Sequence, residues 1–352
     1  MLDTKVMAEI AETHFSPVVI KEFGQVGSQV LREMLEFLRN ELFRYIDVEL
    51  YRKQIVVFKN IGKANPLSLK GSTVLPSVTH LAQGFKKGFV VQMLEQGKIR
   101  LWNNTSVDVN AISQKALVYV YHNRSDRFVA KGKVGRIPNP DSNHASVFAI
   151  PTFDSLVEAL MFYKLKRANN SACKILVGVW FEEARLFFAT VPRKPEEVMR
   201  DSLSEFLKSH LRGDVDVHPE HNVNETEPVD VRVQWLFSKS QGLIEIKWMG
   251  KSKSPQGKIT ANHGPSRARQ GAKRLAEYLE EEKMQTPTNA VRGYLVVIDA
   301  RRWGLKRTDT KIDSRNGLYY QNSEIEYSPE YHKIRDDFEE PIRMFVVPKL
   351  NV

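Results

Sequence analysis

The second half of the chain constrains the fold most, because its helix and strand signals follow one another in a clear order. A helix is predicted to begin at Pro195, where proline and two glutamates suit a first turn, and to stop before Gly213. A second helix is predicted from Ser266 to about Lys283. The predicted strands cover residues 214–223, 228–236, 242–249 and 292–300, the last a continuous apolar run typical of a buried strand. The resulting order, helix, three strands, helix and strand, predicts an α/β domain.

Two of these strands alternate polar and apolar residues, so the polar side chains of each lie on one face. In the first, Asp230 points away from a run of valines, and in the second, Glu245 and Lys247 point away from Ile244, Ile246 and a tryptophan. If the strands are neighbours, the three polar side chains lie close together. Two converging carboxylates form a hard-oxygen site suited to Mg²⁺. A nearby lysine can orient or help deprotonate an attacking water and offset charge developing on a phosphate.

This arrangement resembles the PD-(D/E)XK nuclease superfamily, which has the restriction-endonuclease-like fold, over residues 193–310. The family core has the same element order around a mixed central sheet, with an aspartate on its second strand and a (D/E)-x-K motif on its third. Asp230 matches the aspartate, and Glu245-Ile246-Lys247 matches the motif, although the Pro-Asp dipeptide is absent because Val229 precedes Asp230. The resemblance implies phosphodiester hydrolysis with Mg²⁺, or Mn²⁺, held by the two carboxylates.

The resemblance also implies functional residues on the two helices. Family members often carry a further glutamate on the first helix, and Glu205 is the candidate for this third metal ligand, with Asp201 as a rival. Gln270, on the helix after the motif, is similar to a glutamine that some branches of the family place near the site. The expected catalytic set is therefore Asp230, Glu245, Lys247, Glu205 and Gln270.

The short motif carries little weight alone, since [DE]-x-K occurs four times in the chain. Only the occurrence at Glu245 lies on an alternating strand that follows another such strand with an acid, Asp230. The alternative interpretation is a surface ladder of salt bridges on an exposed sheet face, where opposite charges often pair across strands.

Basic residues gather just beyond the motif. The segment from Lys247 to Arg274 contains eight basic residues and no acidic one. A loop and helix start of this charge could hold the phosphates beside a scissile bond, while the plain alternative is a solvated loop. The candidates for nucleic-acid contacts are Lys251, Lys253, Lys258, Arg267, Arg269, Lys273 and Arg274.

Residues 1–192 are expected to form a separate α+β domain, which leaves residues 193–352 to the nuclease-like domain. An amphipathic helix is predicted over residues 26–44, short strands follow it, and two more strands are expected within residues 173–181 and 184–191. Residues 51–136 hold 15 basic and 3 acidic side chains, a net charge of +12, which suggests a polyanion partner such as nucleic acid. Four aromatic residues there could stack on bases or, as is more usual, form the core: Trp102, Tyr119, Tyr121 and Phe128.

Composition limits the remaining possibilities. The only cysteine of the 352 residues, Cys173, excludes an internal disulfide and a multi-cysteine metal site. The first residues lack the pattern of a signal peptide, and no apolar run approaches the ~18 residues that span a bilayer, so we expect a cytoplasmic protein with no membrane partner. The expected function is a Mg²⁺-dependent endonuclease with a nucleic-acid-binding N-terminal domain.

Analogy with the family makes double-stranded DNA the expected partner, and defence against foreign DNA the expected role. A homodimer, or a partner protein that gates the activity, remains open. Two other functions also remain open: a non-catalytic nucleic-acid-binding or scaffold subunit with an inert nuclease fold, and a structure-selective junction resolvase.

Overall fold

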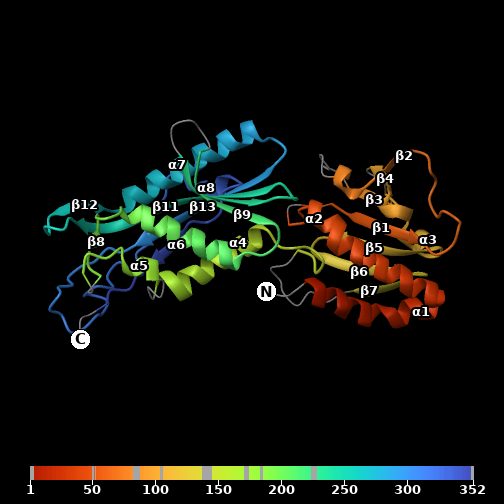
Figure 1. The fold of residues 1–352 in the computed structure, drawn as a ribbon, viewed down its shortest axis with the longest axis horizontal. Coiled ribbons are helices and arrows are strands. Elements are labelled where there is room, and N and C mark those ends of the chain that lie inside the picture. The colour runs from red at the N-terminus through yellow and green to blue at the C-terminus, as the bar shows by residue number, and fades with distance from the viewer. Residues whose placement is uncertain are drawn as a thin grey trace. The chain divides into compact units, whose positions relative to one another are not determined.

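The computed structural model describes residues 4–49, 51, 53–81, 88–103, 106–136, 145–169, 174–182, 185–222 and 228–349. The protein is mixed α/β and forms two compact units, residues 1–154 and 155–352 (Figure 1). The division lies before the boundary predicted at residue 192. The reason is a helix beginning near residue 153 that packs within the second unit, where the Tyr163 hydroxyl lies 2.7 Å from Ser202 Oγ and Phe162 stacks on Phe206.

The first unit begins with a long helix that covers one face of a seven-stranded sheet (Figure 1). Gly24, with φ of +67°, interrupts the helix where a side chain would strain the backbone. The helix predicted over residues 26–44 is confirmed, and its apolar positions, such as Leu31, Met34 and Leu38, are buried. The helical elements of this unit are α1 (Thr4–Phe37), a π-helical turn (Leu38–Leu42), α2 (Phe43–Tyr45), two 3₁₀ turns (Val78–Leu81 and Glu95–Gly97) and α3 (Val109–Ser113).

The sheet of the first unit has the order β2-β4-β3-β1-β5-β6-β7. All its neighbouring strands are antiparallel except β1 and β3, which are parallel. The strands are β1 (Ile55–Asn60), β2 (Ser72–Leu75), β3 (Phe89–Met93), β4 (Ile99–Asn103), β5 (Ala116–His122), β6 (Ser125–Ala130) and β7 (Lys133–Arg136).

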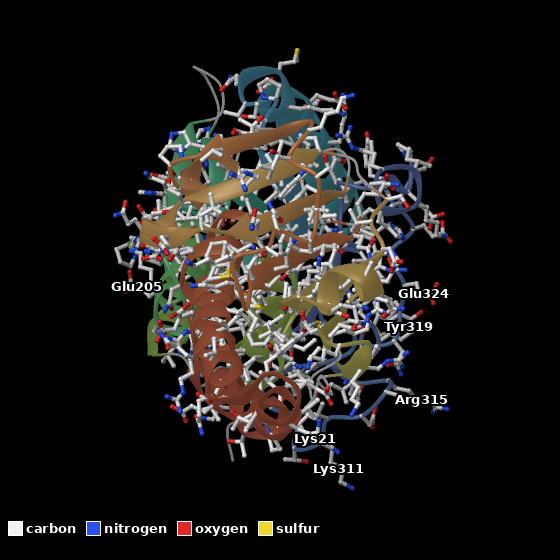
Figure 2. All side chains as sticks on the ribbon, turned by 90° about the vertical axis from the view of Figure 1, so that its right-hand side faces the viewer. Lys21, Glu205, Lys311, Arg315, Tyr319 and Glu324 are labelled. Carbon is white, nitrogen blue, oxygen red and sulfur yellow. The ribbon has the colours of Figure 1, made fainter. Side chains whose placement is uncertain are left out.

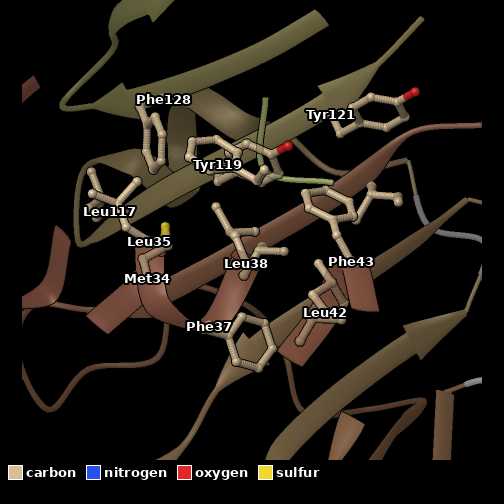
Figure 3. Close-up of a cluster of buried hydrophobic side chains, with 14 of the residues drawn as sticks. Met34, Leu35, Phe37, Leu38, Leu42, Phe43, Leu117, Tyr119, Tyr121 and Phe128 are labelled. Carbon is tan, nitrogen blue, oxygen red and sulfur yellow. The ribbon is translucent and has the colours of Figure 1, made fainter. Parts of the chain in front are cut away.

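The aromatic residues of the basic segment form the core of this unit. Tyr119, Tyr121 and Phe128 pack with the apolar face of the N-terminal helices (Figure 3), and Trp102 lies in a second cluster on the opposite face of the sheet. All four are at most 4% exposed, so the core interpretation is confirmed and the base-stacking alternative is wrong for them. The Tyr119 hydroxyl donates to the buried carboxylate of Asp126.

Part of the +12 charge of residues 51–136 is neutralised within the unit. Lys59 forms an ion pair with Glu33, and Lys133 forms one with Glu22, both acids of α1. The acidic helix and the basic sheet therefore balance each other in part, which weakens the argument from charge alone for a polyanion partner.

The second unit is built on a mixed sheet whose main path is β14-β13-β11-β10-β9. Strands β9, β10 and β11 are antiparallel, and β11, β13 and β14 are parallel. The elements are α4 (Phe153–Tyr163), a π-helical turn (Lys164–Ala168), α5 (Lys174–Val177), β8 (Phe188–Ala189), α6 (Pro195–His210), β9 (Val215–Asn222), β10 (Pro228–Trp235), β11 (Ser240–Lys253), β12 (Ile259–His263), α7 (Pro265–Gln285), β13 (Ala290–Asp299), α8 (Tyr331–Ile334) and β14 (Ile342–Phe345).

The predicted order of the second half is confirmed, with β12 as an addition. The segment expected to be a basic loop forms an antiparallel hairpin of β11 and β12. Helix α7 covers one face of the sheet and α6 packs on the other (Figure 1). The strand predicted within residues 173–181 is wrong for most of its described part, which is the helix α5 and a turn, and only Trp180 pairs, in an isolated antiparallel bridge with Phe188. A short apolar run fits either structure, and periodicity does not separate them.

None of the helices in the described ranges combines the length and the apolar character needed to cross a membrane.

Candidate active site

Asp230, Glu245 and Lys247 come together where β10 and β11 stop pairing. The ladder between the two strands ends at Val231 and Ile244, one residue before the acids. The Asp230 side chain then continues the contact, since its Oδ2 accepts a hydrogen bond of 2.7 Å from the backbone N–H of Ile246. This bond holds the Asp230 carboxylate against β11, as the sequence pattern predicted for neighbouring strands.

The Lys247 ammonium lies between the two carboxylates. It forms a close ion pair with Glu245 Oε1, lies 4.0 Å from Asp230 Oδ2 and donates to the Ile246 carbonyl at 3.1 Å. The side chains of Glu245 and Lys247 are 1% and 4% exposed, and that of Asp230 is 18% exposed. An exposed salt-bridge ladder is therefore excluded, and Asp230 is the member of the cluster that faces solvent.

Helix α7 buries the cluster, and a glycine allows its close approach. A Cβ at Gly271 would lie 2.5 Å from Lys247 Cγ and 3.0 Å from Leu295 Cδ1, closer than side chains pack. The aliphatic part of Lys247 thus lies directly against the helix backbone. Around it, buried apolar residues of α7, β11 and β13, such as Leu275, form one core cluster, so the charged groups lie at the edge of a dry interior.

A second cation reaches the cluster from α7. Arg274 Nε lies 3.8 Å from Glu245 Oε1, and it also donates to the Tyr278 hydroxyl. That hydroxyl donates in turn to the Pro228 carbonyl at 3.0 Å, which ties the start of β10 to the helix. Arg274 was predicted as a phosphate contact, and the structure places it beside the carboxylates, with its side chain 32% exposed.

Burial strongly disfavours the charge on the two acids. Burial, with the negative charge of Asp230, raises the pKa of Glu245 to about 8, against the opposing effects of Lys247 and Arg274. Burial likewise raises the pKa of Asp230, which Lys247 partly offsets. Glu245 Oε2 is buried and has no hydrogen-bond partner among the described residues. An unsatisfied buried carboxylate oxygen is costly and is typical of functional sites.

The acid of α6 that acts on the cluster is Glu196, not Glu205. The Glu205 side chain is 63% exposed and pairs with Lys208 at 3.1 Å, and Figure 2 shows it at the periphery of the molecule. The rival Asp201 pairs with Arg193 at 2.6 Å. The charge of Glu196, in contrast, raises the pKa of Asp230. The sequence signal for it is the acidic first turn of α6, which also fits a helix start and so does not by itself indicate a site.

The remaining predicted residues are dispersed. Gln270 is exposed, and none of its described contacts joins it to the carboxylates. Arg267 pairs with Glu196 at 2.7 Å, and Lys273 lies 3.6 Å from Glu277. The other candidates for nucleic-acid contacts are Lys251 and Lys258, which are exposed on the β11–β12 hairpin, Lys253, which lies over the Phe187 ring at 3.8 Å, and Arg269, which is exposed on α7.

The residues present fit an oxygen-ligated divalent cation in part. Two carboxylates converge, and the buried one, that of Glu245, has an oxygen without a hydrogen-bond partner. Within the described ranges, however, no three His, Cys, Asp or Glu side chains come close enough together to hold a metal ion. Comparisons with protein-family models, with curated proteins and with solved structures found no match, so the site rests on its own geometry.

Proposed function

We propose that the protein is a metal-dependent nuclease that hydrolyses phosphodiester bonds, with Asp230, Glu245 and Lys247 as its catalytic residues. The observation that carries the proposal is the buried carboxylate of Glu245, which faces a second acid and has an oxygen without a hydrogen-bond partner. A chain keeps such a group at a cost in stability, and a bound cation would offset that cost. The resemblance to the PD-(D/E)XK family, with its restriction-endonuclease-like core, agrees with these three positions.

Asp230 and Glu245 would hold Mg²⁺ or Mn²⁺, because both ions prefer oxygen ligands. A cation bound there supplies polarisation of the phosphate and an acidified water. Lys247 would exchange its ion pair with Glu245 for the attacking water or a phosphate oxygen, and Arg274 would balance negative charge developing at the same place. Glu196 would act on Asp230 through its negative charge and would not be a third ligand of the cation.

Double-stranded DNA is the proposed substrate, and the choice follows the resembled family. The charge of the region is compatible with it, because basic side chains such as Lys251 and Lys258 are exposed on the neighbouring hairpin. Cytoplasmic defence against foreign DNA, and gating by a second copy or a partner protein, belong to the same analogy.

One observation favours a second candidate, a nucleic-acid-binding subunit that does not cut. Lys247 pairs with Glu245 and lies 4.0 Å from Asp230, an arrangement that also suits a buried ion pair with a structural role. The two functions differ in whether Mg²⁺ displaces the lysine.

Cleavage of labelled substrates with Mg²⁺ or with EDTA tests the proposal. Duplex DNA, single-stranded DNA, a four-way junction and RNA are compared side by side, which also tests the junction-resolvase alternative. We expect Mg²⁺-dependent cutting by the wild type, and a loss of at least about 100-fold in Glu245→Gln and Lys247→Met. The methionine keeps the apolar stem that packs against Gly271.

Glu197→Gln is the matched control, because Glu197 is a partly exposed acid of α6 that lies 3.7 Å from Arg193. It should cut like the wild type. Equal cutting by all four proteins would show that the site is elsewhere, and no cutting of any substrate by the wild type would favour the non-catalytic subunit.

A further inference from the structure

A cavity of about 740 Å³ lies at the end of β11, beside the candidate active site and separate from it. Its floor is the junction of β11 with the segment after β13, where the Ala300 N–H donates to the Met249 carbonyl at 2.8 Å. Gly250 makes this junction possible, because its φ is +141° and a Cβ there would lie 3.1 Å from the Ala300 carbonyl oxygen. A cavity of this size suits a small organic molecule and exceeds the needs of a single inorganic ion.

Cations line the cavity, and none of the described residues that line it is acidic. The cations are Lys251, Arg301, Arg302 and Lys306. One buried carboxylate, Asp299, lies behind the wall, and it is shared by Arg301 at 2.8 Å and by Arg343 at 2.6 Å. Within the described ranges, Lys251, Arg302 and Lys306 form no ion pair with a carboxylate, although Asp299 acts on Arg302 and Asp309 accepts from the Lys306 backbone N–H at 2.7 Å. The wall therefore carries positive charge that these two acids compensate only in part.

Arg302 shows how poorly that charge is satisfied. Its guanidinium donates only to backbone carbonyls, those of Arg301 at 2.9 Å and Val346, and its Nε is buried without an acceptor among the described residues. Burial, together with the charge of Arg185, lowers the pKa of Arg302 to about 9, although Asp299 opposes the shift. A buried arginine is normally paired with an anion, so its surroundings favour an anionic ligand.

Aromatic side chains stand at the same wall. Trp303 lines the cavity and is 58% exposed, whereas tryptophan side chains in folded proteins are usually largely buried. Its ring lies 5.7 Å from that of Tyr319, which Figure 2 labels at the edge of the molecule. Tyr320 also lines the cavity and carries the Arg301 guanidinium at 4.5 Å from its ring centre. Exposed rings next to unpaired cations are the combination that binds a base and its phosphate.

We propose that this cavity binds a nucleotide, with its phosphate at Lys251, Arg302 and Lys306 and its base against Trp303. The choice of a nucleotide over other aromatic anions rests on the proposed nuclease function. The same chemistry could come from one nucleotide of a bound nucleic-acid strand or from a free mononucleotide, and the ligands used in the test distinguish these sources.

Binding to the full chain is measured in EDTA, so that no substrate is cut. The first probe is a 5′-phosphorylated oligothymidylate, followed by fluorescence anisotropy of a label on the oligonucleotide. The others are thymidine monophosphate, adenosine monophosphate and inorganic phosphate, followed by isothermal titration calorimetry, which does not depend on Trp303. The variant Lys251→Ala/Lys306→Ala should weaken nucleotide binding at least about tenfold. For the oligonucleotide, the plot of the logarithm of the binding constant against the logarithm of salt concentration should also become less steep by about 1.4, the change expected for two lost phosphate contacts. Trp303→Leu should weaken the nucleotides about tenfold and leave inorganic phosphate unchanged.

The charge-matched control is Lys208→Ala/Lys283→Ala, which removes two exposed lysines that do not line the cavity. Weakening by this control equal to that of the cavity variant would mean that only net charge matters, and would overturn the proposal. Equal affinity for phosphate and for nucleotides would overturn it as well.

If the monophosphates and the oligonucleotide all bind and compete with one another, the natural ligand is one nucleotide of a nucleic-acid strand. If only the monophosphates bind, the natural ligand is a free nucleotide. The cleavage assay is independent of these measurements. If the protein binds nucleotides in this cavity but cuts no substrate, the cavity proposal stands and the nuclease proposal fails. If the protein cuts and both cavity variants bind nucleotides as the wild type does, the nuclease proposal stands and the cavity proposal fails.

Discussion

Replacing Glu245 by glutamine in the metal-free protein tests the electrostatics of the site, because glutamine has the shape of the protonated carboxyl and does not ionise. Burial raises the pKa of Glu245 from near 4.5 to about 8. A carboxyl with a higher pKa in the folded chain takes up protons on folding, so the free energy of unfolding falls as pH rises from about 4.5 to about 8. At about 1.4 kcal/mol for each pH unit, this loss amounts to at most about 5 kcal/mol in the wild type. The Glu245→Gln variant lacks this pH-dependent loss, because glutamine does not ionise.

Urea unfolding in EDTA between about pH 5 and pH 9 measures the effect. Tryptophan fluorescence reports mainly on the second unit, because only one of the five tryptophans, Trp102, lies in the first. We expect the wild type and Glu245→Gln to be similarly stable near pH 5, and the variant to become progressively more stable than the wild type up to about pH 8. Mg²⁺ should then stabilise the wild type at pH 8 and leave the variant unchanged.

The result that refutes this reasoning is a constant difference in stability between wild type and variant over the whole pH range. Glu245 would then be ionised throughout, with the ion pair to Lys247 outweighing burial. Glu197→Gln, on a partly exposed acid, should follow the pH dependence of the wild type and shows what other titrating groups contribute.

Three further predictions concern packing and the assignment of acids. Gly271→Ala should lower the free energy of unfolding by up to about 2 kcal/mol, since overpacking against Lys247 costs about 1–3 kcal/mol and the higher helix propensity of alanine returns about 1 kcal/mol. Gly62→Ala, which has open space around it, should change the free energy of unfolding little, and urea unfolding measures both variants. Glu196→Gln should slow Mg²⁺-dependent cleavage about tenfold or more, while Glu205→Gln should cut at the wild-type rate, and initial rates on duplex DNA compare them. Tyr119→Phe should destabilise the first unit by about 1–3 kcal/mol, followed by circular dichroism, because its buried carboxylate acceptor loses a donor.

The sequence predicted the elements from α6 to β13 well because their signals are local and repeated. The alternation around Asp230 and Glu245 determines which side chains share a face, and antiparallel pairing of adjacent strands brings them together. The burial of both strand faces was not visible in the pattern, since a polar face normally indicates solvent. Burial of the polar face follows from the close approach of α7 at Gly271, which the sequence analysis did not use.

The errors in the site arise from long-range geometry. Glu205 was chosen by its helix, but a helix presents different residues to its sheet at every turn, and Glu205 points to solvent. Neither Arg274 beside Glu245 nor Glu196 near Asp230 could be read from spacing, because each depends on how α6 and α7 cross the strands. In the first unit, the charge of residues 51–136 gave no indication that Lys59 and Lys133 pair with acids of α1.

Strand β11 connects Glu245 and Lys247 to the cavity through its backbone. Lys247 and Lys251 lie four residues apart on it, which corresponds to about 13 Å of extended chain. If the protein cuts a strand of which one nucleotide lies in the cavity, this fixed spacing would determine which phosphodiester reaches Glu245. The products would then have ends at a constant distance from the bound nucleotide.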